Sequence, residues 1–209
     1  MAAPSPFDPI PLFAVPLYTS IVDGHERYQA ALIQEILEHK KQDPTGDVRS
    51  NRGTAWHSGP EFQESRSEAL AWLLQSVTRF ARIALAPHYD NWSSRALRMG
   101  SYWANVLGRH GFNAPHHHMP EVWSGVYYVQ VGPLGEGHLG EDRRDFSGWI
   151  EFLNPNLSHS AWGQGNFAQK PKDGMVLLFP SSQLHYVNPV KVKSQRITVA
   201  FNFDVVQTT

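Results

Sequence analysis

The half of the chain that begins at residue 95 is built of short apolar segments, and this pattern restricts the fold more than any other feature. Segments rich in β-branched and aromatic residues are separated there by loops rich in Gly, Pro, Asn and Ser; they cover 96–107, 122–131, 148–153, 175–179 and 197–206. Short strands with turn residues between them are typical of β-sandwiches and barrels. We therefore expect seven or eight strands in a jelly-roll arrangement.

Two amphipathic helices are predicted before these strands. Apolar residues recur with helical spacing over 25–40. A second helix, of about 25 residues, is predicted to begin at a capping box formed by Ser58 and Glu61 and to end at Pro87. Its apolar stripe indicates that it packs against one sheet. Residues 42–57 are polar and are predicted to form a loop.

The first residues of the chain have a different character. Four prolines within the first eleven positions predict an extended arm, and a short strand is expected over 12–18. The length of 209 residues suits one domain. We expect a single domain over 1–209, in which 1–94 supply the arm and helical support and 95–206 form the β-barrel core.

Composition excludes several classes of partner and chemistry. The chain has 18 Lys and Arg against 19 Asp and Glu, so no basic surface for nucleic acid or an anionic membrane is expected. The absence of cysteine excludes disulfides, thiolate metal sites and cysteine nucleophiles. No signal-peptide pattern and no apolar run long enough to span a bilayer is evident, so we expect a cytoplasmic protein.

Histidine is the unusual residue, with 11 in the chain, and three of them are consecutive. In an extended strand His116 and His118 would share a face, whereas His117 would point away. A third ligand must then come from a distant strand, and the best candidate is His185, which follows a strongly apolar segment. Three neutral imidazoles suit Fe, Cu, Zn or Ni and do not suit Mg or Ca. The alternative is a cluster of solvent-exposed loop histidines without function.

Arg196 is the second candidate functional residue. It begins a strand pattern in which it shares a face with Thr198 and Ala200, while bulky apolar residues occupy the other face. A guanidinium inside a barrel needs an anionic partner. A bound carboxylate would supply one, since Arg grips carboxylates through two hydrogen bonds. The alternative is an ion pair with an Asp or Glu at the sheet edge.

Together these residues resemble the Fe(II)/2-oxoglutarate-dependent oxygenases, and most closely a bacterial and phage group similar to prolyl hydroxylases. The resemblance is carried by the segments NAPHHHMPEVWSGVYYV, GMVLLFPSSQLHYVNPV and QRITVAFNF, and to a lesser degree by RGTAWHS and YWANVLGRHGFN. It extends over residues 10–206. It implies a double-stranded β-helix with N-terminal helices, in which Fe(II) lies at the mouth of the barrel.

The resemblance also implies an activity and roles for individual residues. The activity is oxidation of a substrate, with hydroxylation the expected outcome, coupled to conversion of 2-oxoglutarate and O₂ into succinate and CO₂. The implied metal ligands are His116, His118 and His185. The residues implied to hold the far carboxylate of 2-oxoglutarate are Arg196, Thr198 and Tyr128. The substrate, a small molecule or a peptide, is expected to touch residues that flank the mouth: Trp103, Asn105 and Asn113.

One position departs from the superfamily pattern. His118 stands where the usual ligand is Asp or Glu, so the metal site would be more positive by one charge. Glu121 is the nearest spare carboxylate, and we interpret it as a loop residue or as a partner that orients a ligand histidine. If Glu121 were itself a ligand, a cupin-type metal-dependent oxygenase that works without 2-oxoglutarate would be the better interpretation.

A second alternative comes from another functional class. The chain would then be a non-catalytic jelly-roll module that binds a peptide or glycan through exposed aromatic residues. The loop over 132–147 is interpreted either as a lid over the site or as a solvated charged segment. No function is predicted for the isolated loop histidines, which are His57, His110, His138 and His159.

Overall fold

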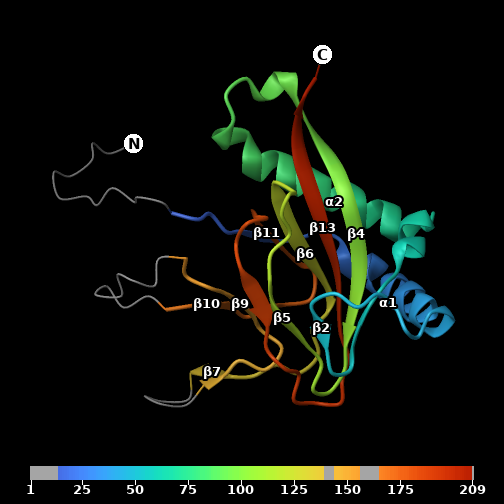
Figure 1. The fold of residues 1–209 in the computed structure, drawn as a ribbon. Helices are drawn as coiled ribbons and strands as arrows, with labels where there is room; N and C mark the ends of the chain where they lie inside the picture. The colour runs from blue at the N-terminus through green and yellow to red at the C-terminus, as the bar shows by residue number, and fades with distance from the viewer. Residues whose placement is uncertain (1–13, 139–143, 156–164, 209) are drawn as a thin grey trace.

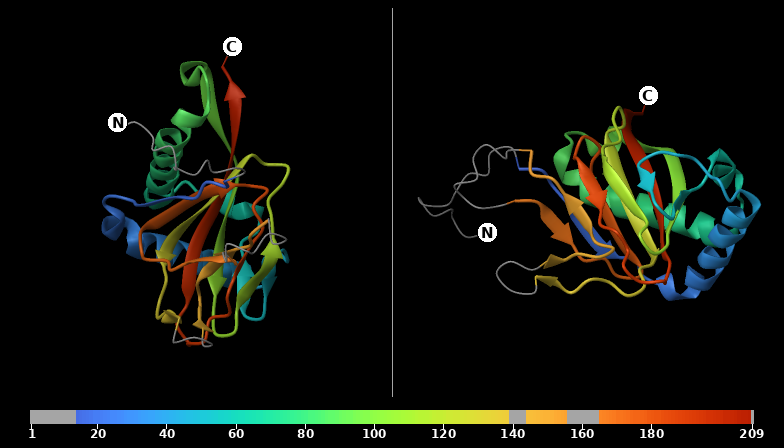
Figure 2. Two further views of the ribbon diagram at one scale, coloured as in Figure 1. Left: turned by 90° about the vertical axis from the view of Figure 1, so that its left-hand side faces the viewer. Right: turned by 60° about the horizontal axis from the view of Figure 1, so that its bottom comes forward.

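The fold is layered, with two helices against one face of a large sheet and a smaller sheet against the other (Figures 1 and 2). The computed structural model describes residues 14–138, 144–155 and 165–208. Every strand pairing in these ranges is antiparallel. The mainly β architecture with helices packed on one sheet is the one predicted from the sequence.

The larger sheet has six strands, and the longest of them come from the segments with the clearest β pattern. Its order across the sheet is β1 (Tyr18–Ile21), β11 (Met175–Pro180), β6 (Trp123–Gln130), β13 (Arg196–Gln207), β4 (Arg95–Leu107) and β3 (Ala55–His57). The predicted strands over 96–107, 122–131, 175–179 and 197–206 are therefore confirmed to within a residue or two at each end.

The smaller sheet has five strands, most of them only two or three residues long. Its order is β10 (Phe167–Gln169), β9 (Ile150–Phe152), β12 (His185–Val187), β5 (Phe112–His116) and β2 (Asn51–Arg52). A separate two-stranded ribbon joins β7 (Gly137–His138) to β8 (Arg144–Asp145). Within the described residues, no strand pairing joins the two main sheets, so they face each other without closing into a barrel.

The helices are α1 (His25–Gln42) and α2 (Glu68–Leu85), with short 3₁₀ turns at Pro60–Glu64, Ala86–His88 and Trp92–Ser94. Both helices bury their apolar stripes in one cluster with the larger sheet, to which α1 contributes Leu32 and Ile36 and α2 contributes Leu73 and Val77. No helix in the described part of the chain is long and apolar enough to cross a membrane.

The larger sheet is buried on both faces, which explains its almost continuous apolar sequences. One face packs on the helices, as Val199 and Phe201 do in β13. The other face packs on the smaller sheet, where Leu177, Phe179 and Ile150 belong to a second cluster. The predicted alternation in β13 is confirmed, because Arg196 and Thr198 point to the side of the smaller sheet, where a cavity lies.

The prediction for the start of the second helix is wrong. Ser58 does not cap a helix; its hydroxyl accepts a hydrogen bond from the Ala104 backbone N–H at 3.1 Å. A 3₁₀ turn follows, and α2 begins after Ser67, whose hydroxyl accepts from the Leu70 N–H at 3.0 Å. The Ser58 hydroxyl is occupied by its contact with β4, and Ser67 takes the capping role.

The short strands were missed for a common reason. Residues 51–52 and 55–57, predicted as loop, are β2 and β3, and strand β1 occupies 18–21 rather than 12–18, of which 12–13 lie outside the described residues. Two or three residues are too few to show an alternating pattern, so these strands depend on their pairing partners. All three precede residue 95 and pair with strands that follow it.

We expect Ser67→Ala to lower the free energy of unfolding by about 1 kcal/mol, because the Leu70 N–H loses its capping partner. Urea denaturation followed by circular dichroism measures the change. Gln75→Ala, at an exposed position in the middle of α2, is the matched control and should be nearly neutral. An equal effect of both substitutions would contradict the assignment of Ser67 as the cap.

Candidate metal centre and cofactor pocket

Three histidines meet at one end of a cavity of about 850 Å³ between the two sheets. His116 ends β5 and His185 begins β12, and the two residues are direct partners in the pairing of these strands. His118 lies two residues beyond the end of β5, where its backbone N–H donates to the Ser181 carbonyl at 2.9 Å. One nitrogen from each ring lies within 4.8 Å of the other two.

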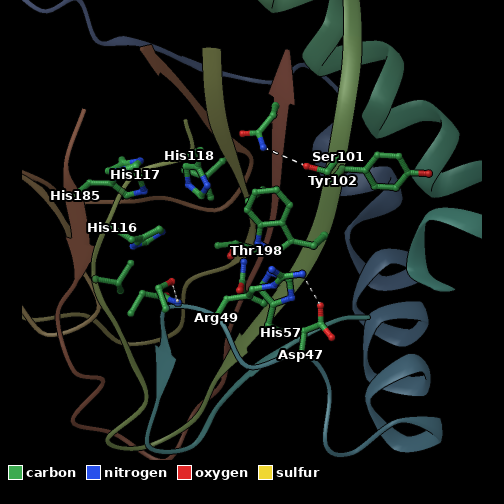
Figure 3. Close-up of a pocket in the computed structure, with 18 of the residues that line it drawn as sticks. Asp47, Arg49, His57, Ser101, Tyr102, His116, His117, His118, His185 and Thr198 are labelled. Atoms are coloured by element: carbon green, nitrogen blue, oxygen red, sulfur yellow. Dashed lines mark hydrogen bonds and ion pairs between the residues drawn. The ribbon is translucent and has the colours of Figure 1, made fainter. Parts of the chain in front are cut away.

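Figure 3 shows the rings of His116, His118 and His185 beside this cavity. The ring centroids of His116 and His185 are 4.4 Å apart. The ring centroid of His118 lies 4.9 Å from that of His116 and 5.2 Å from that of His185. His117 is exposed, and its Nδ1 accepts a hydrogen bond from the Met119 N–H at 3.2 Å. The structure thus brings together the three histidines that the sequence singled out, although His118 is not itself in a strand.

Backbone carbonyls orient two of these rings for metal binding. Nδ1 of His116 lies 2.7 Å from the Ala114 carbonyl oxygen, and Nδ1 of His185 lies 2.9 Å from that of Gln183. A carbonyl can only accept, so Nδ1 carries the hydrogen in each ring and Nε2 keeps its lone pair. This is the arrangement that partners outside the metal shell usually impose on ligand histidines.

Burial keeps all three imidazoles neutral. It lowers the pKa of His118 to about 3, lowers that of His116, and lowers that of His185, which is only 4% exposed, well below 6.5. The proximity of the rings adds to the effect, because each would repel a proton on its neighbours. Metal ions bind the neutral form, so the site needs no proton release at pH 7.

Arg196 is a buried cation with no anionic partner among the residues that the structure describes. It is 2% exposed, and its Nε–H donates to the Gly148 carbonyl at 3.0 Å. Within the described residues, no carboxylate lies within ion-pair distance of its guanidinium. Burial lowers the pKa of Arg196. An unpaired buried charge lowers the stability of the folded protein, so a bound anion would stabilise this guanidinium.

Polar groups surround this guanidinium. Its central carbon lies 5.0 Å from the ring centroid of Tyr128, and burial raises the pKa of the Tyr128 phenol. Thr198 is the direct strand partner of both Tyr128 in β6 and Asn105 in β4, which aligns the three residues in one row. The Tyr128 hydroxyl and the Asn105 carbonyl oxygen are buried without a well-formed hydrogen bond to any described residue. The Tyr128 hydroxyl and the Arg196 guanidinium can both donate hydrogen bonds and so fit a negatively charged ligand, whereas the Asn105 oxygen can only accept one.

The candidate substrate residues also line the cavity. The Trp103 ring lies 5.3 Å from that of His118 and stacks on His57 at 5.4 Å with an interplanar angle of 13°. The Asn113 amide donates to the Ser50 hydroxyl at 3.3 Å. Asn105, 7% exposed, has the orphaned oxygen noted above.

Sequence reasoning missed part of the cavity wall. His57 was expected to be a solvated loop residue, but it lies in β3, packs on Trp103 and lines the cavity, and burial lowers its pKa. Arg49, paired with Asp47 at 3.1 Å, also lines it (Figure 3). No local signal marks these residues, because His57 lies in a strand of three residues and Arg49 lies in the bend that precedes β2.

Glu121 stays apart from the three histidines. It lines the cavity but is not one of the residues whose ligand atoms converge. Partial burial and the nearby Asp204 carboxyl raise the pKa of Glu121. The ligand group found among the described residues therefore consists of imidazoles alone, as predicted for His118, and the arrangement that would require Glu121 as a ligand is not present.

The neutral histidines predict a pH dependence for the metal-free protein. Below about pH 6.5 the His118 side chain is protonated in the unfolded chain but stays neutral in the folded protein. The His118 contribution to stability should therefore fall as the pH drops from 6.5 toward 3 and stay constant above 6.5. A glutamine at position 118 cannot be protonated, so His118→Gln should reduce the slope of unfolding free energy against pH, by close to one proton near pH 5 and by about half a proton at pH 6.5. Urea titrations between pH 5 and 7 measure this, with His117→Gln as the exposed control. Identical slopes for wild type and His118→Gln would contradict it.

Comparison with known proteins points to one family. Residues 101–202 match a family model described as "Putative 2OG-Fe(II) oxygenase", where 2OG denotes 2-oxoglutarate. The matched segment contains all three histidines, Tyr128 and Arg196. Curated proteins give no match in sequence.

Solved structures share the fold at low sequence identity. A prolyl-4-hydroxylase from Pseudomonas putida is 14% identical, with a TM-score of 0.58 and 92% of each chain covered. A viral collagen prolyl hydroxylase from Paramecium bursaria Chlorella virus-1 is 15% identical, with a TM-score of 0.57 over 89% of this chain and 95% of that chain. HygX from Streptomyces hygroscopicus, with nickel and 2-oxoglutarate bound, is 15% identical, with a TM-score of 0.57 over 93% and 83%.

The shared fold is the double-stranded β-helix expected from the sequence, here with two sheets that do not close. The segment over 101–202, which holds the histidine cluster and the buried arginine, matches the model of the 2OG-Fe(II) oxygenase family, and the similar structures share its fold.

Proposed function

We propose that this protein is a non-haem Fe(II) oxygenase that uses 2-oxoglutarate and O₂ to oxidise a substrate. In this proposal His116, His118 and His185 hold the iron, and Arg196 holds the far carboxylate of 2-oxoglutarate. The observation that carries the proposal is the buried guanidinium of Arg196, which shares a cavity with three neutral imidazoles and has no carboxylate partner among the described residues.

The charges of the site fit these cofactors. Imidazoles contribute no charge, so Fe(II) and Arg196 together would bring three positive charges into one cavity. The convergent group contains no carboxylate to offset them. A small dianion with a carboxylate at each end can lie against the metal at one end and the guanidinium at the other, and 2-oxoglutarate has this form. Nitrogen donors are also suitable ligands for iron.

When both cofactors are bound, they supply the oxidising chemistry, in which O₂ is reduced as the keto acid loses CO₂ and becomes succinate. The chain contributes position and environment. Thr198 and Tyr128 lie beside Arg196 and would orient the cofactor with it. Phe152 and Phe179 pack on His185 with centroid distances of 6.0 and 4.8 Å, so water is kept from one side of the metal site.

The substrate would occupy the part of the cavity lined by Trp103, Asn105 and Asn113. The hydroxylases among the similar structures favour hydroxylation as the reaction outcome. A peptide or a small molecule both fit a cavity of this size. The cytoplasmic location expected from the sequence stays a prediction.

Two competing functions are weaker on this structure. A three-histidine oxygenase without 2-oxoglutarate would use the same metal site but would leave the Arg196 guanidinium without an anionic partner among the described residues. A non-catalytic binding module would explain neither the convergence of three neutral imidazoles nor the buried guanidinium.

Arg196→Ala is expected to weaken 2-oxoglutarate binding by about tenfold or more while metal affinity changes little, because a charge-assisted contact is lost at the far carboxylate. The measurement is an anaerobic titration of Fe(II)-loaded protein with 2-oxoglutarate, followed by the visible charge-transfer band of a keto acid on Fe(II). Val192→Ala, a mild substitution at a residue that does not line the cavity, is the control. Equal loss of metal and 2-oxoglutarate binding, or loss of neither, would contradict the role of Arg196.

His118→Ala is expected to lower Fe(II) affinity by about tenfold or more, whereas Glu121→Ala should leave it unchanged. Competition with a chelator that absorbs in the visible measures both constants under anaerobic conditions. The reverse pattern, with loss only in Glu121→Ala, would favour a cupin-type ligand set.

A further inference from the structure

Behind His118, three buried polar side chains form a hydrogen-bonded chain through the larger sheet. The Ser124 hydroxyl lies 2.7 Å from that of Ser181 and 2.8 Å from the Asn202 carbonyl oxygen. The Asn202 amide donates to the Ser101 hydroxyl at 3.1 Å. Ser124, Ser181 and Asn202 are 1%, 0% and 4% exposed, and all their side-chain polar atoms have partners. The chain runs from the end of β11 through β6 and β13 to β4.

Ser181 connects this chain to both metal-ligand segments. Its carbonyl accepts the hydrogen bond from the His118 N–H at 2.9 Å, and its own N–H donates to the Val122 carbonyl at 3.0 Å. It also lies in the turn after β11 that leads to His185, where the Gln183 N–H donates to the Pro180 carbonyl at 2.9 Å. A shift of Ser181 would therefore move His118 relative to His185.

His118 depends on this anchor more than the other ligands do. His116 and His185 are strand residues, and each ring is held by a backbone carbonyl. His118 lies beyond the end of β5, and no hydrogen bond from its ring to another described residue is present. Its ring is held by packing against Trp103 and the two other histidines.

An irregularity in the larger sheet makes room for this hydrogen-bonded chain. The pairing of β13 with β4 shifts register between Phe201 and Phe203, so Asn202 has no direct partner in β4. Irregularities of this kind re-aim a side chain and are frequent near functional sites. Here the Asn202 amide reaches Ser101 while the flanking phenylalanines stay in the apolar core.

Stability alone does not account for polar groups at this depth. Apolar residues of the same shape in place of a fully paired buried network are often neutral or stabilising. What such a network supplies is a single, defined geometry. We propose that Ser124, Ser181 and Asn202 are positioning residues, which hold the backbone of His118 where its ring can bind the metal. This inference rests on the proposed metal site and adds residues that do not touch the metal.

The test uses Co(II) alone as the probe, because its visible spectrum reports the number and geometry of ligands. We expect Ser124→Ala and Asn202→Leu to lower Co(II) affinity by about tenfold, the lower end of the usual range for groups that support ligands. We also expect the d–d bands to shift toward those of His118→Ala. Asn202→Leu conserves side-chain volume and carries the test if Ser124→Ala does not fold.

Val199→Ala is the matched control for stability. Val199 lies in the same strand as Asn202 but packs on the helix side of the sheet. Its loss should lower the melting temperature at least as much as Asn202→Leu does, without changing the Co(II) spectrum. Wild-type affinity and spectrum in folded Asn202→Leu would overturn the positioning role.

The same measurements separate this inference from the proposed metal site. If wild-type protein binds no Co(II), or if His118→Ala binds it as wild type does, the three-histidine site itself fails. If His118→Ala loses affinity while both network variants bind normally, the site stands and only the positioning role fails.

Discussion

Strand β13 carries the constraint on which both the core and the site depend, because it lies within a sheet that is covered on both faces. Ile197 and Val199 face the helices, whereas Arg196 and Thr198 face the cavity. A slip of one residue in its pairing would move a guanidinium into the apolar core and a bulky aliphatic side chain into the cavity. The register that builds the core is thus the same register that places the charged end of the site.

Electrostatics in the cavity follow from desolvation. Burial lowers the pKa of both kinds of nitrogen base in the site, but the histidines lose their charge, whereas the guanidinium keeps its charge because its ordinary pKa is so high. The result is a cavity with a neutral, electron-donating end and a cationic end. Such a polarised space selects ligands that chelate a metal at one end and carry negative charge at the other. Short dicarboxylic keto acids have both properties.

The parts of the structure that could be predicted from the sequence are those with a long enough pattern. The alternation around Arg196 predicted which face of β13 meets the cavity, and the spacing of His116 and His118 predicted their convergence. The sequence points to Ser58 as the cap because Glu61 follows it at capping-box spacing, whereas Ser67 has Leu70 at that spacing; the tertiary contact of Ser58 with Ala104 cannot be read locally. His57 was missed because β3 has three residues and takes its direction from β4. The role we propose for Ser181 could not be predicted from the neighbouring sequence either, since it depends on a hydrogen bond from His118, which lies 63 positions away.

The short strands of the smaller sheet have a consequence for how the protein holds together. β12 and β2 have three and two residues, so few backbone hydrogen bonds fix this sheet, whereas β4 and β13 share a long pairing in the larger one. Segments with few such bonds open first in native-state fluctuations. An ion bound by His116 and His185 would join β5 to β12 at the point where they pair. The bound metal would then stabilise the pairing of β5 with β12, and its release would loosen the smaller sheet while the larger sheet stays intact.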